Sequence, residues 1–305
     1  MSASVSRRDF LLASAAFAGM MAHSASAPEG SGGRIRFGAC RPLGDASLLK
    51  SVGYDFIECD VASCLIPAKG ADDWKRQLDL IASLSVPLEA CNCLIPGSYR
   101  LTGPKADHAP ALDYVETVME RADQAGVKYL VFGSGGARNV PGDFLSKDGR
   151  GKPDLERGVG QFTEFCRRLS GRAATLKNVT VVIEPLRPNE SNIVNYVWQA
   201  IQISDDVNSP RVQVLADFYH MMMGRESADS ILSARSRLRH CHIAEFRSRA
   251  FPGSNSAKNE MYRPYFDALK AIGYTGGVSC ECGWGAKKDL ARNLETSLGV
   301  MRSFC

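Results

Sequence analysis

Four side chains of the types that bind metal ions or transfer protons stand at or near the ends of short apolar runs: Glu184, Asp217, His242 and Glu281. Each follows residues that we expect to be buried, where an unpaired carboxylate would be costly. Converging carboxylates repel one another unless a cation balances their charge. Three oxygen ligands and one imidazole suit a single divalent ion, Mn first and then Co, Mg or Zn. Any one of them alone could instead be a polar group satisfied in a core or at a helix cap.

After Gly33 the chain alternates short β-rich runs with stretches of helical periodicity. The runs predicted to be strands are 35–40, 56–60, 87–93, 128–134, 179–184, 212–217, 240–245 and 276–282. Apolar residues recur at helical spacing over 74–84, after a candidate cap at Asp72, and over 115–122, before Gly126. Further helices are expected at about 155–176, 191–205, 226–236, 262–272 and 288–303.

Eight strands separated by helical patterns, without hairpin signals, predict a parallel sheet. Eight strands also close a (β/α)8 TIM barrel, for which about 270 residues is a usual length. The alternative is an open, doubly wound sheet, which does not need polar residues at several strand ends. A single barrel domain over 31–305 would bring the ends of the last four predicted strands to one mouth, and with them the four side chains above.

The first thirty residues differ from the rest of the chain. Residues 6–12 contain the pair Arg7 and Arg8, and an apolar run over 11–21 and a small-residue stretch follow. This order resembles a twin-arginine (Tat) export signal, and the apolar run is short for a bilayer span. We therefore expect 1–30 to be a Tat-type signal and linker, the Tat export machinery to be a partner, and the mature protein to lie in the periplasm or otherwise outside the cytoplasm, without stable membrane insertion. An ordinary amphipathic first helix is the alternative.

The net charge and the cysteine content of the chain limit the kinds of function that it can have. The formal net charge of +4 is small and comes partly from the two N-terminal arginines, so it indicates neither nucleic-acid nor membrane-surface binding. Ten cysteines in an exported protein could form a disulfide framework. Most of them, however, fall in predicted strands, where a free thiol behaves as a small buried hydrophobe, so we expect structural thiols. The cysteines in those strands are Cys40, Cys59, Cys91, Cys93, Cys241, Cys280 and Cys282.

Several motifs around the four residues resemble those of the xylose-isomerase-like barrels, a superfamily that includes ketose 3-epimerases and hydroxypyruvate isomerases. The resemblance covers essentially the whole chain after the signal and is strongest over 179–283. It is specific for the superfamily and weak for the substrate. The matching stretches are Glu184-Pro185-Leu186 followed by Glu190 and Asn195, Asp217-Phe218-Tyr219-His220, His242-Ile243-Ala244-Glu245 followed by Arg249, and Gly273 to Glu281.

The resemblance implies roles for individual residues. The four residues would bind the metal, and Glu184 and Glu281 would also be the acid/base pair. His220, Arg249 and Glu190 would hold hydroxyl or carbonyl oxygens of a carbohydrate substrate. Arg247 competes with Arg249 for that role, and Glu190 could instead be a carboxylate favoured by a helix N-terminus. Separately, Glu58, late in the second predicted strand, is expected to point into the barrel, either as a substrate contact or as a partner of His242 or of an arginine.

This set of groups favours proton transfer beside a carbonyl through an enediolate. The first hypothesis is a sugar or keto-sugar isomerase or epimerase acting on a non-phosphorylated substrate. A dehydratase or lyase acting on a keto-sugar or a 3-oxidised glycoside is the alternative, followed by a non-catalytic sugar-binding barrel. An endonuclease IV-like nuclease fits least, because five histidines and no long basic run leave little for a multi-metal cluster or for nucleic acid. The resemblance also allows a homo-oligomer.

Overall fold

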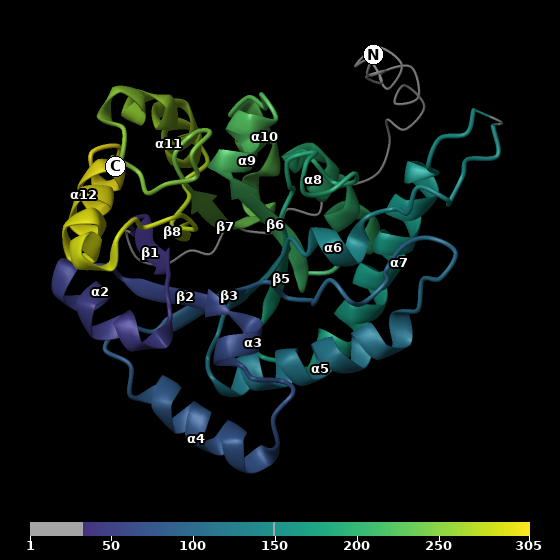
Figure 1. Cartoon of the computed structure of the whole chain (residues 1–305), viewed down its shortest axis with the longest axis horizontal. Helices are drawn as coiled ribbons and strands as arrows, with labels where there is room; N and C mark the ends of the chain where they lie inside the picture. Colours follow the sequence, from purple (N-terminus) through teal and green to yellow (C-terminus); the bar gives the residue numbers. More distant parts are fainter. Residues whose placement is uncertain (1–32, 149) are drawn as a thin grey trace. The chain divides into compact units, whose positions relative to one another are not determined.

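The computed structural model describes residues 33–148 and 150–305, and eight parallel strands within them close into a barrel. In Figure 1 the strands form a ring. Each strand pairs with its neighbours in sequence, and β8 pairs with β1. The strands are β1 (Arg36–Cys40), β2 (Phe56–Asp60), β3 (Leu88–Asn92), β4 (Tyr129–Phe132), β5 (Thr180–Ile183), β6 (Val212–Asp217), β7 (Leu238–Ile243) and β8 (Gly277–Cys280).

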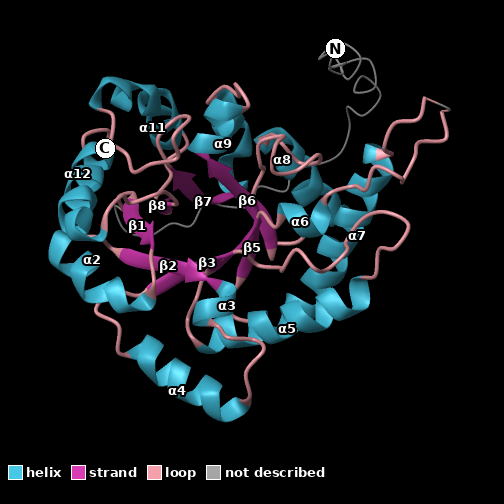
Figure 2. Ribbon diagram, viewed as in Figure 1, coloured by secondary structure: helices cyan, strands magenta, loops and turns pink. Residues whose placement is uncertain are grey.

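Helices surround the ring of strands, as Figure 2 shows in cyan and magenta. Most of them follow a strand and return the chain to the start of the next one, as a parallel barrel requires. The helices are α2 (Ala46–Val52), α3 (Val61–Cys64), α4 (Ala71–Ala82), α5 (His108–Gln124), α6 (Gly135–Arg138), α7 (Leu155–Arg172), α8 (Val197–Val207), α9 (Phe218–Met223), α10 (Asp229–Ala234), α11 (Arg263–Ala271) and α12 (Leu290–Arg302).

Two apolar layers hold the barrel together, because successive side chains of a strand point to opposite faces. Residues facing outward pack against the helices. Cys280, for example, lies with its Sγ 3.2 Å from the Oγ of Ser297 on α12. Inside the barrel, Val131, Val182 and Leu215 form a separate, fully buried cluster. The interior is therefore packed in this layer, and polar chemistry is confined to the layers nearer the ends of the strands.

The structure confirms the predicted barrel and all eight strands. Strands β2 and β6 have the predicted bounds, β7 begins and ends two residues earlier, and the other five are one to three residues shorter than expected. Two helix details differ. The N-cap of α4 is Gly70, and Asp72 lies in its first turn. Helix α8 begins at Val197, because the preceding residues form a loop tied by side-chain hydrogen bonds rather than a helical turn. Gly126 adopts a φ of +71° just past α5, as predicted for a residue that ends a helix.

All ten cysteines lie in the described part of the chain, and all ten are free thiols, six of them buried. This agrees with the predicted structural role. The predicted export signal over 1–30 lies outside the described residues. Within 33–148 and 150–305, no helix is both long and apolar enough to cross a bilayer.

Candidate metal centre

Glu184, Asp217, His242 and Glu281 converge at the carboxyl ends of the barrel strands. Each offers one ligand atom, and these four atoms all lie within 4.8 Å of one another. Asp217 ends β6 and is the register partner of His242 on β7, while Glu184 and Glu281 directly follow β5 and β8. The first three are buried and Glu281 is half-buried. The closed barrel thus assembles a compact site with three carboxylates and one imidazole.

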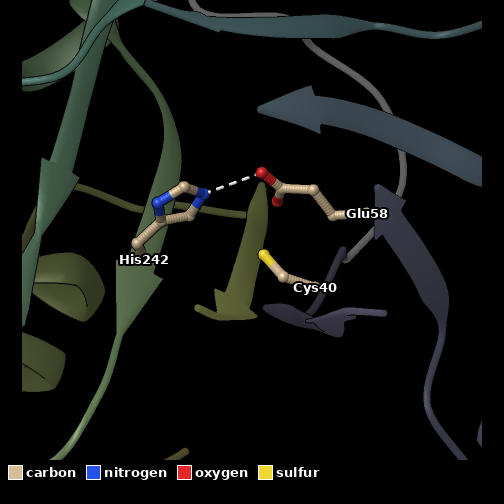
Figure 3. Close-up of side chains that lie close together, drawn as sticks. All are labelled: Cys40, Glu58 and His242. Carbon is tan, nitrogen blue, oxygen red and sulfur yellow. Dashed lines mark hydrogen bonds and ion pairs between the residues drawn. The ribbon is translucent and has the colours of Figure 1, made fainter. Parts of the chain in front are cut away.

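The imidazole of His242 is held from both sides. Its Nδ1 lies 3.0 Å from Oε1 of Glu184, and its Nε2 lies 2.9 Å from Oε1 of Glu58. The other oxygen of Glu58 lies 2.9 Å from Nε2 of His240, one layer deeper in the barrel. Figure 3 shows the contact between Glu58 and His242 across the barrel interior. The ring therefore directs Nδ1 toward the other three residues.

Glu58 has no oxygen left for a substrate. Its side chain is fully buried, and each of its oxygens bonds a histidine. Of the two roles predicted for Glu58, a substrate contact would require one of these histidine bonds to be given up. Its position corresponds to the alternative, a partner that orients His242. Burial would raise the pKa of Glu58, but the two histidines lower it below its usual value.

A second group of ligand atoms comprises Cys40, Glu58 and His242, again within 4.8 Å of one another (Figure 3). It shares His242 with the first group and uses the side of the ring already bonded to Glu58. Burial, followed by the charge of Glu58, raises the pKa of the Cys40 thiol well above its ordinary value. Both oxygens of Glu58 and the Nε2 of His242 are already hydrogen-bonded in this group, whereas the four-residue group brings three carboxylates and one imidazole together, so the four-residue group is the stronger metal centre.

The two carboxylate oxygens of Asp217 make different contacts. Its Oδ1 accepts hydrogen bonds from the backbone N–H groups of Tyr219 (2.7 Å) and His220 (3.3 Å), which caps α9. Its Oδ2 lies 3.6 Å from Nε2 of His220. Burial, together with the nearby Glu281, raises the pKa of Asp217 to about 6. The cap fixes the carboxylate at the site without using the second oxygen in a backbone bond.

The remaining two carboxylates differ in proton affinity. Burial and the adjacent Glu281 raise the pKa of Glu184. Burial acts in the same direction on Glu281, but His242 and Arg249 outweigh it and lower the pKa of that carboxyl. Carboxylates that are buried together favour protonation unless a cation neutralises them. The donor set and its electrostatics therefore fit a divalent cation.

A pocket of about 530 Å³ opens in front of these carboxylates. Four of the predicted site residues line it: Glu184, Glu190, Arg249 and Glu281. Arg249 donates to Oε1 of Glu190 at 3.2 Å and also to Oε2 of Glu281, which places its guanidinium across the pocket. Arg247 is exposed and lies over the ring of Phe246. Of the two arginines, Arg249 is the one at the site.

His220 is buried beside Asp217 and Glu190, with only 1% of its surface exposed. Its Nδ1 accepts from the backbone N–H of Arg187, while its Nε2 has no hydrogen-bond partner within 33–148 and 150–305 and lies 3.9 Å from Oε2 of Glu190. Burial lowers the pKa of His220. A neutral imidazole with an unpartnered Nε2 can donate to an oxygen placed between these groups.

Three neighbours of the site were not among the predicted site residues. Asn92, the last residue of β3, donates from Nδ2 to Oε1 of Glu281 at 2.9 Å. A polar side chain at a strand end was the available signal, the same one that identified the metal residues. Gly133 and Gly135 follow β4, and a Cβ atom on either would overlap Glu184 Oε2 or the backbone oxygen of Glu190, respectively. These glycines therefore give the two carboxylate residues room.

Trp284, three residues after Glu281, packs away from the pocket. It is buried, lies stacked on Phe251 with 3° between the ring planes, and does not line the pocket. His240, two residues before His242 on β7, stacks on Tyr129 and contacts Glu58 deeper in the barrel.

Comparison with known protein families gives one match that covers most of the chain. The family model for the xylose isomerase-like TIM barrel matches residues 46–304. The chain belongs to the xylose isomerase-like TIM barrel family. The match covers nearly the whole described barrel, so the four-residue centre lies inside the family domain.

Relatives within the xylose isomerase-like family are sugar epimerases by name. The chain is 29% identical over 153 residues to the ketose 3-epimerase of Arthrobacter globiformis, which is 50% of this chain and 50% of that protein. It is 28% identical over 137 residues to the 3-dehydro-D-guloside 4-epimerase of Escherichia coli, 45% of this chain and 50% of that protein. These sequence matches thus span about half the length of either relative.

A solved structure agrees in fold over a longer stretch. The D-psicose 3-epimerase of Clostridium cellulolyticum, determined with D-tagatose, superposes with a TM-score of 0.71 at 18% identity, covering 88% of this chain and 99% of that one. At this identity the likeness establishes the barrel fold.

Proposed function

We propose that the protein is a divalent-metal-dependent epimerase or isomerase of a sugar or keto-sugar. The observation that carries this proposal is the convergence of four ligand atoms, from Glu184, Asp217, His242 and Glu281, within 4.8 Å beside a pocket that two of these carboxylates also line. The ketose 3-epimerase relatives support it. Manganese is the first choice, with Co, Mg or Zn as alternatives, because the set of three oxygens and one nitrogen suits all four ions.

A bound divalent ion would supply Lewis-acid stabilisation of the negative charge that develops when a proton leaves the carbon beside a carbonyl. Glu184, Asp217, His242 and Glu281 would hold it. Since Glu184 and Glu281 both line the pocket, each can also act on the substrate as well as on the ion.

Glu184 and Glu281 are suited to move the proton. One carboxylate removes it from the carbon next to the carbonyl, which gives an enediolate, and the other returns a proton. Return to the opposite face of the same carbon gives an epimer, and return to the neighbouring carbon gives an isomer. Arg249 and Glu190 line the same pocket, His220 lies buried 3.9 Å from Glu190, and these three residues would hold the hydroxyl and carbonyl oxygens. In the described part of the chain the Nε2 of His220 has no hydrogen-bond partner, so it is available as a donor.

A second candidate is a dehydratase or lyase acting on a keto-sugar or a 3-oxidised glycoside. The similarity to a 3-dehydro-D-guloside 4-epimerase favours a glycoside as substrate. The enediolate is common to both reactions, and expulsion of a β-substituent from it gives elimination instead of epimerisation. The two candidates therefore share the first proton transfer and differ in the product.

The test is solvent deuterium exchange. Full-chain protein loaded with Mn²⁺ is incubated in D₂O with a panel of free ketoses, their phosphates and 3-keto-glycosides, and products are identified by NMR and mass spectrometry. Glu184→Gln and Glu281→Gln should each slow exchange by about 100-fold or more, with unchanged circular dichroism. Glu190→Gln, a neighbouring carboxylate in the same pocket, is the matched control and should mainly raise KM. Exchange at the wild-type rate in both acid/base variants would refute the assignment.

We further propose that the chain works outside the cytoplasm on a non-phosphorylated substrate. The support is the Arg7-Arg8 pattern followed by the apolar run over 11–21. Cell fractionation tests it: the native chain should appear in the exported fraction, and the double variant Arg7→Lys, Arg8→Lys should remain in the cytoplasm. Identical distributions would exclude Tat export.

A further inference from the structure

A fully buried arginine stands behind the proposed metal centre. The side chain of Arg138, the last residue of α6, is 0% exposed. Among the described residues it makes four hydrogen bonds, and all four go to neutral oxygens rather than to carboxylates. A buried cation without an ion-pair partner is costly. The hydrogen bonds made by the guanidinium must therefore offset the free-energy cost of burying its charge.

The acceptors of Arg138 lie at the ends of two neighbouring strands and at both ends of one loop. Phe132 ends β4, and Glu184 follows β5, the strand paired with β4. Val194 lies at the other end of the loop that begins at Glu184. The four bonds run from Nε to Ser191 Oγ (3.3 Å), from Nη1 to the backbone oxygen of Phe132 (3.2 Å), and from Nη2 to the backbone oxygens of Glu184 (2.9 Å) and Val194 (3.2 Å).

We propose that Arg138 is a positioning residue that fixes the main chain at Glu184 and thereby directs its carboxylate to the metal. This inference rests on the proposed metal-dependent function. Arg138 donates to the backbone oxygen of Glu184, while the carboxylate of the same residue occupies space that a Cβ atom at Gly133 would overlap. The same guanidinium closes the loop that carries Glu190, the partner of Arg249. One buried side chain thus sets both a metal ligand and a pocket residue.

The variant Arg138→Lys tests whether the geometry of the guanidinium or only its positive charge is needed. A guanidinium presents five N–H donors in a rigid fork, whereas an ammonium is a point charge on a flexible stem. Arg138→Lys therefore keeps the positive charge near Glu184 and loses the simultaneous hold on four oxygens.

Arg121 is a matched control. It is also buried, and it also donates to backbone oxygens, at 3.0 Å to Leu65 and 2.7 Å to Lys69. Its acceptors lie in the loop after α3, and none of them lines the pocket. Arg121→Lys should therefore cost stability in a similar way without reaching the metal centre.

The experiment measures Mn²⁺ binding to chelator-treated full-chain protein by calorimetry, with no substrate present, alongside the unfolding midpoint. Arg138→Lys should weaken Mn²⁺ binding by about 10-fold or more, as loss of a residue that orients a ligand does elsewhere, while Arg121→Lys stays within about twofold of wild type. Unchanged binding in Arg138→Lys, or equal weakening in both variants, would overturn the inference.

Two further outcomes are decisive. If Arg138→Lys does not fold, Ser191→Ala removes one of the four acceptors and should still weaken Mn²⁺ binding more than about twofold, whereas wild-type affinity there would overturn the inference. A wild-type protein that binds no Mn²⁺ would refute the proposed metal function itself, and the role of Arg138 with it.

Discussion

Glu58 Oε1 lies 2.9 Å from Nε2 of His242, and both side chains are fully buried. This contact leaves Nδ1 as the nitrogen that faces the other metal residues. We predict that Glu58→Gln weakens Mn²⁺ affinity by about 10- to 100-fold, because a neutral amide with a single acceptor oxygen replaces the carboxylate whose two oxygens hold His242 and His240. Calorimetry on the substrate-free protein measures this.

Glu89→Gln is the control for that prediction. Glu89 is also a buried carboxylate, but its oxygens pair with Arg36 and Lys128. It should lose stability and retain Mn²⁺ affinity. Equal affinity in Glu58→Gln and wild type would show that Glu58 does not orient the ligand.

Gly133 should not tolerate a side chain. A Cβ atom there would overlap Glu184 Oε2, so Gly133→Ala must displace the carboxylate. We expect loss of Mn²⁺ affinity and of deuterium exchange with the barrel intact by circular dichroism. Gly160→Ala on α7, where a Cβ meets nothing within 4 Å, should leave both unchanged. Normal metal binding in Gly133→Ala would contradict the close approach.

Substitution of Arg249 should raise KM, whereas substitution of Arg247 should not. Arg249 reaches Glu190 and Glu281 in the pocket, whereas Arg247 is exposed. Arg249→Lys loses the planar fork and should raise KM by about 10-fold or more, since a lost charge-assisted hydrogen bond costs about 1.5–3 kcal/mol. Arg247→Lys should keep the wild-type KM. Steady-state kinetics with the substrate found in the exchange panel measures both, and equal KM values would reassign the pocket arginine.

Asp55 provides a pH-dependent stability contribution. Burial opposes its ionisation, but the Arg34 guanidinium and the backbone N–H of Phe37 outweigh burial and lower the pKa of Asp55 below 3.8. A lowered folded-state pKa stabilises the fold above the unfolded-state pKa, and this stability is lost as pH falls through the folded-state value. Because Arg34 is exposed, we expect Asp55→Asn to cost less than about 1 kcal/mol at pH 7. Thermal unfolding from pH 7 to 3 should show the difference shrinking toward acid.

The strand pattern and the four strand-end residues could be predicted because they depend on local periodicity and on one topological rule. Burial on both faces accounts for the apolar runs 181–183 in β5 and 214–216 in β6, and parallel closure brings the ends of these strands together. The short helix α9 was not predicted. It starts directly at the Asp217 cap, with no loop residues to mark it.

Arg138 and Asn92 show the limit of sequence reasoning. Their roles depend on partners 46 and 189 positions away, Glu184 and Glu281. No spacing rule encodes such pairs, and a fully buried arginine is indistinguishable in sequence from a surface one. The inward direction of Glu58 could be predicted from the alternation of side chains along its strand. Its contacts with His240 and His242 could not be predicted, because they depend on which strands face each other across the barrel.

The most direct test of the account is the metal content and metal requirement of the full-length protein. Purified chain, stripped with chelator and titrated with Mn²⁺, should bind about one ion per chain, lose solvent deuterium exchange when stripped and regain it on reloading. His242→Ala should bind none. A stripped protein that contains no metal by mass spectrometry and still exchanges at the full rate would contradict the proposed centre.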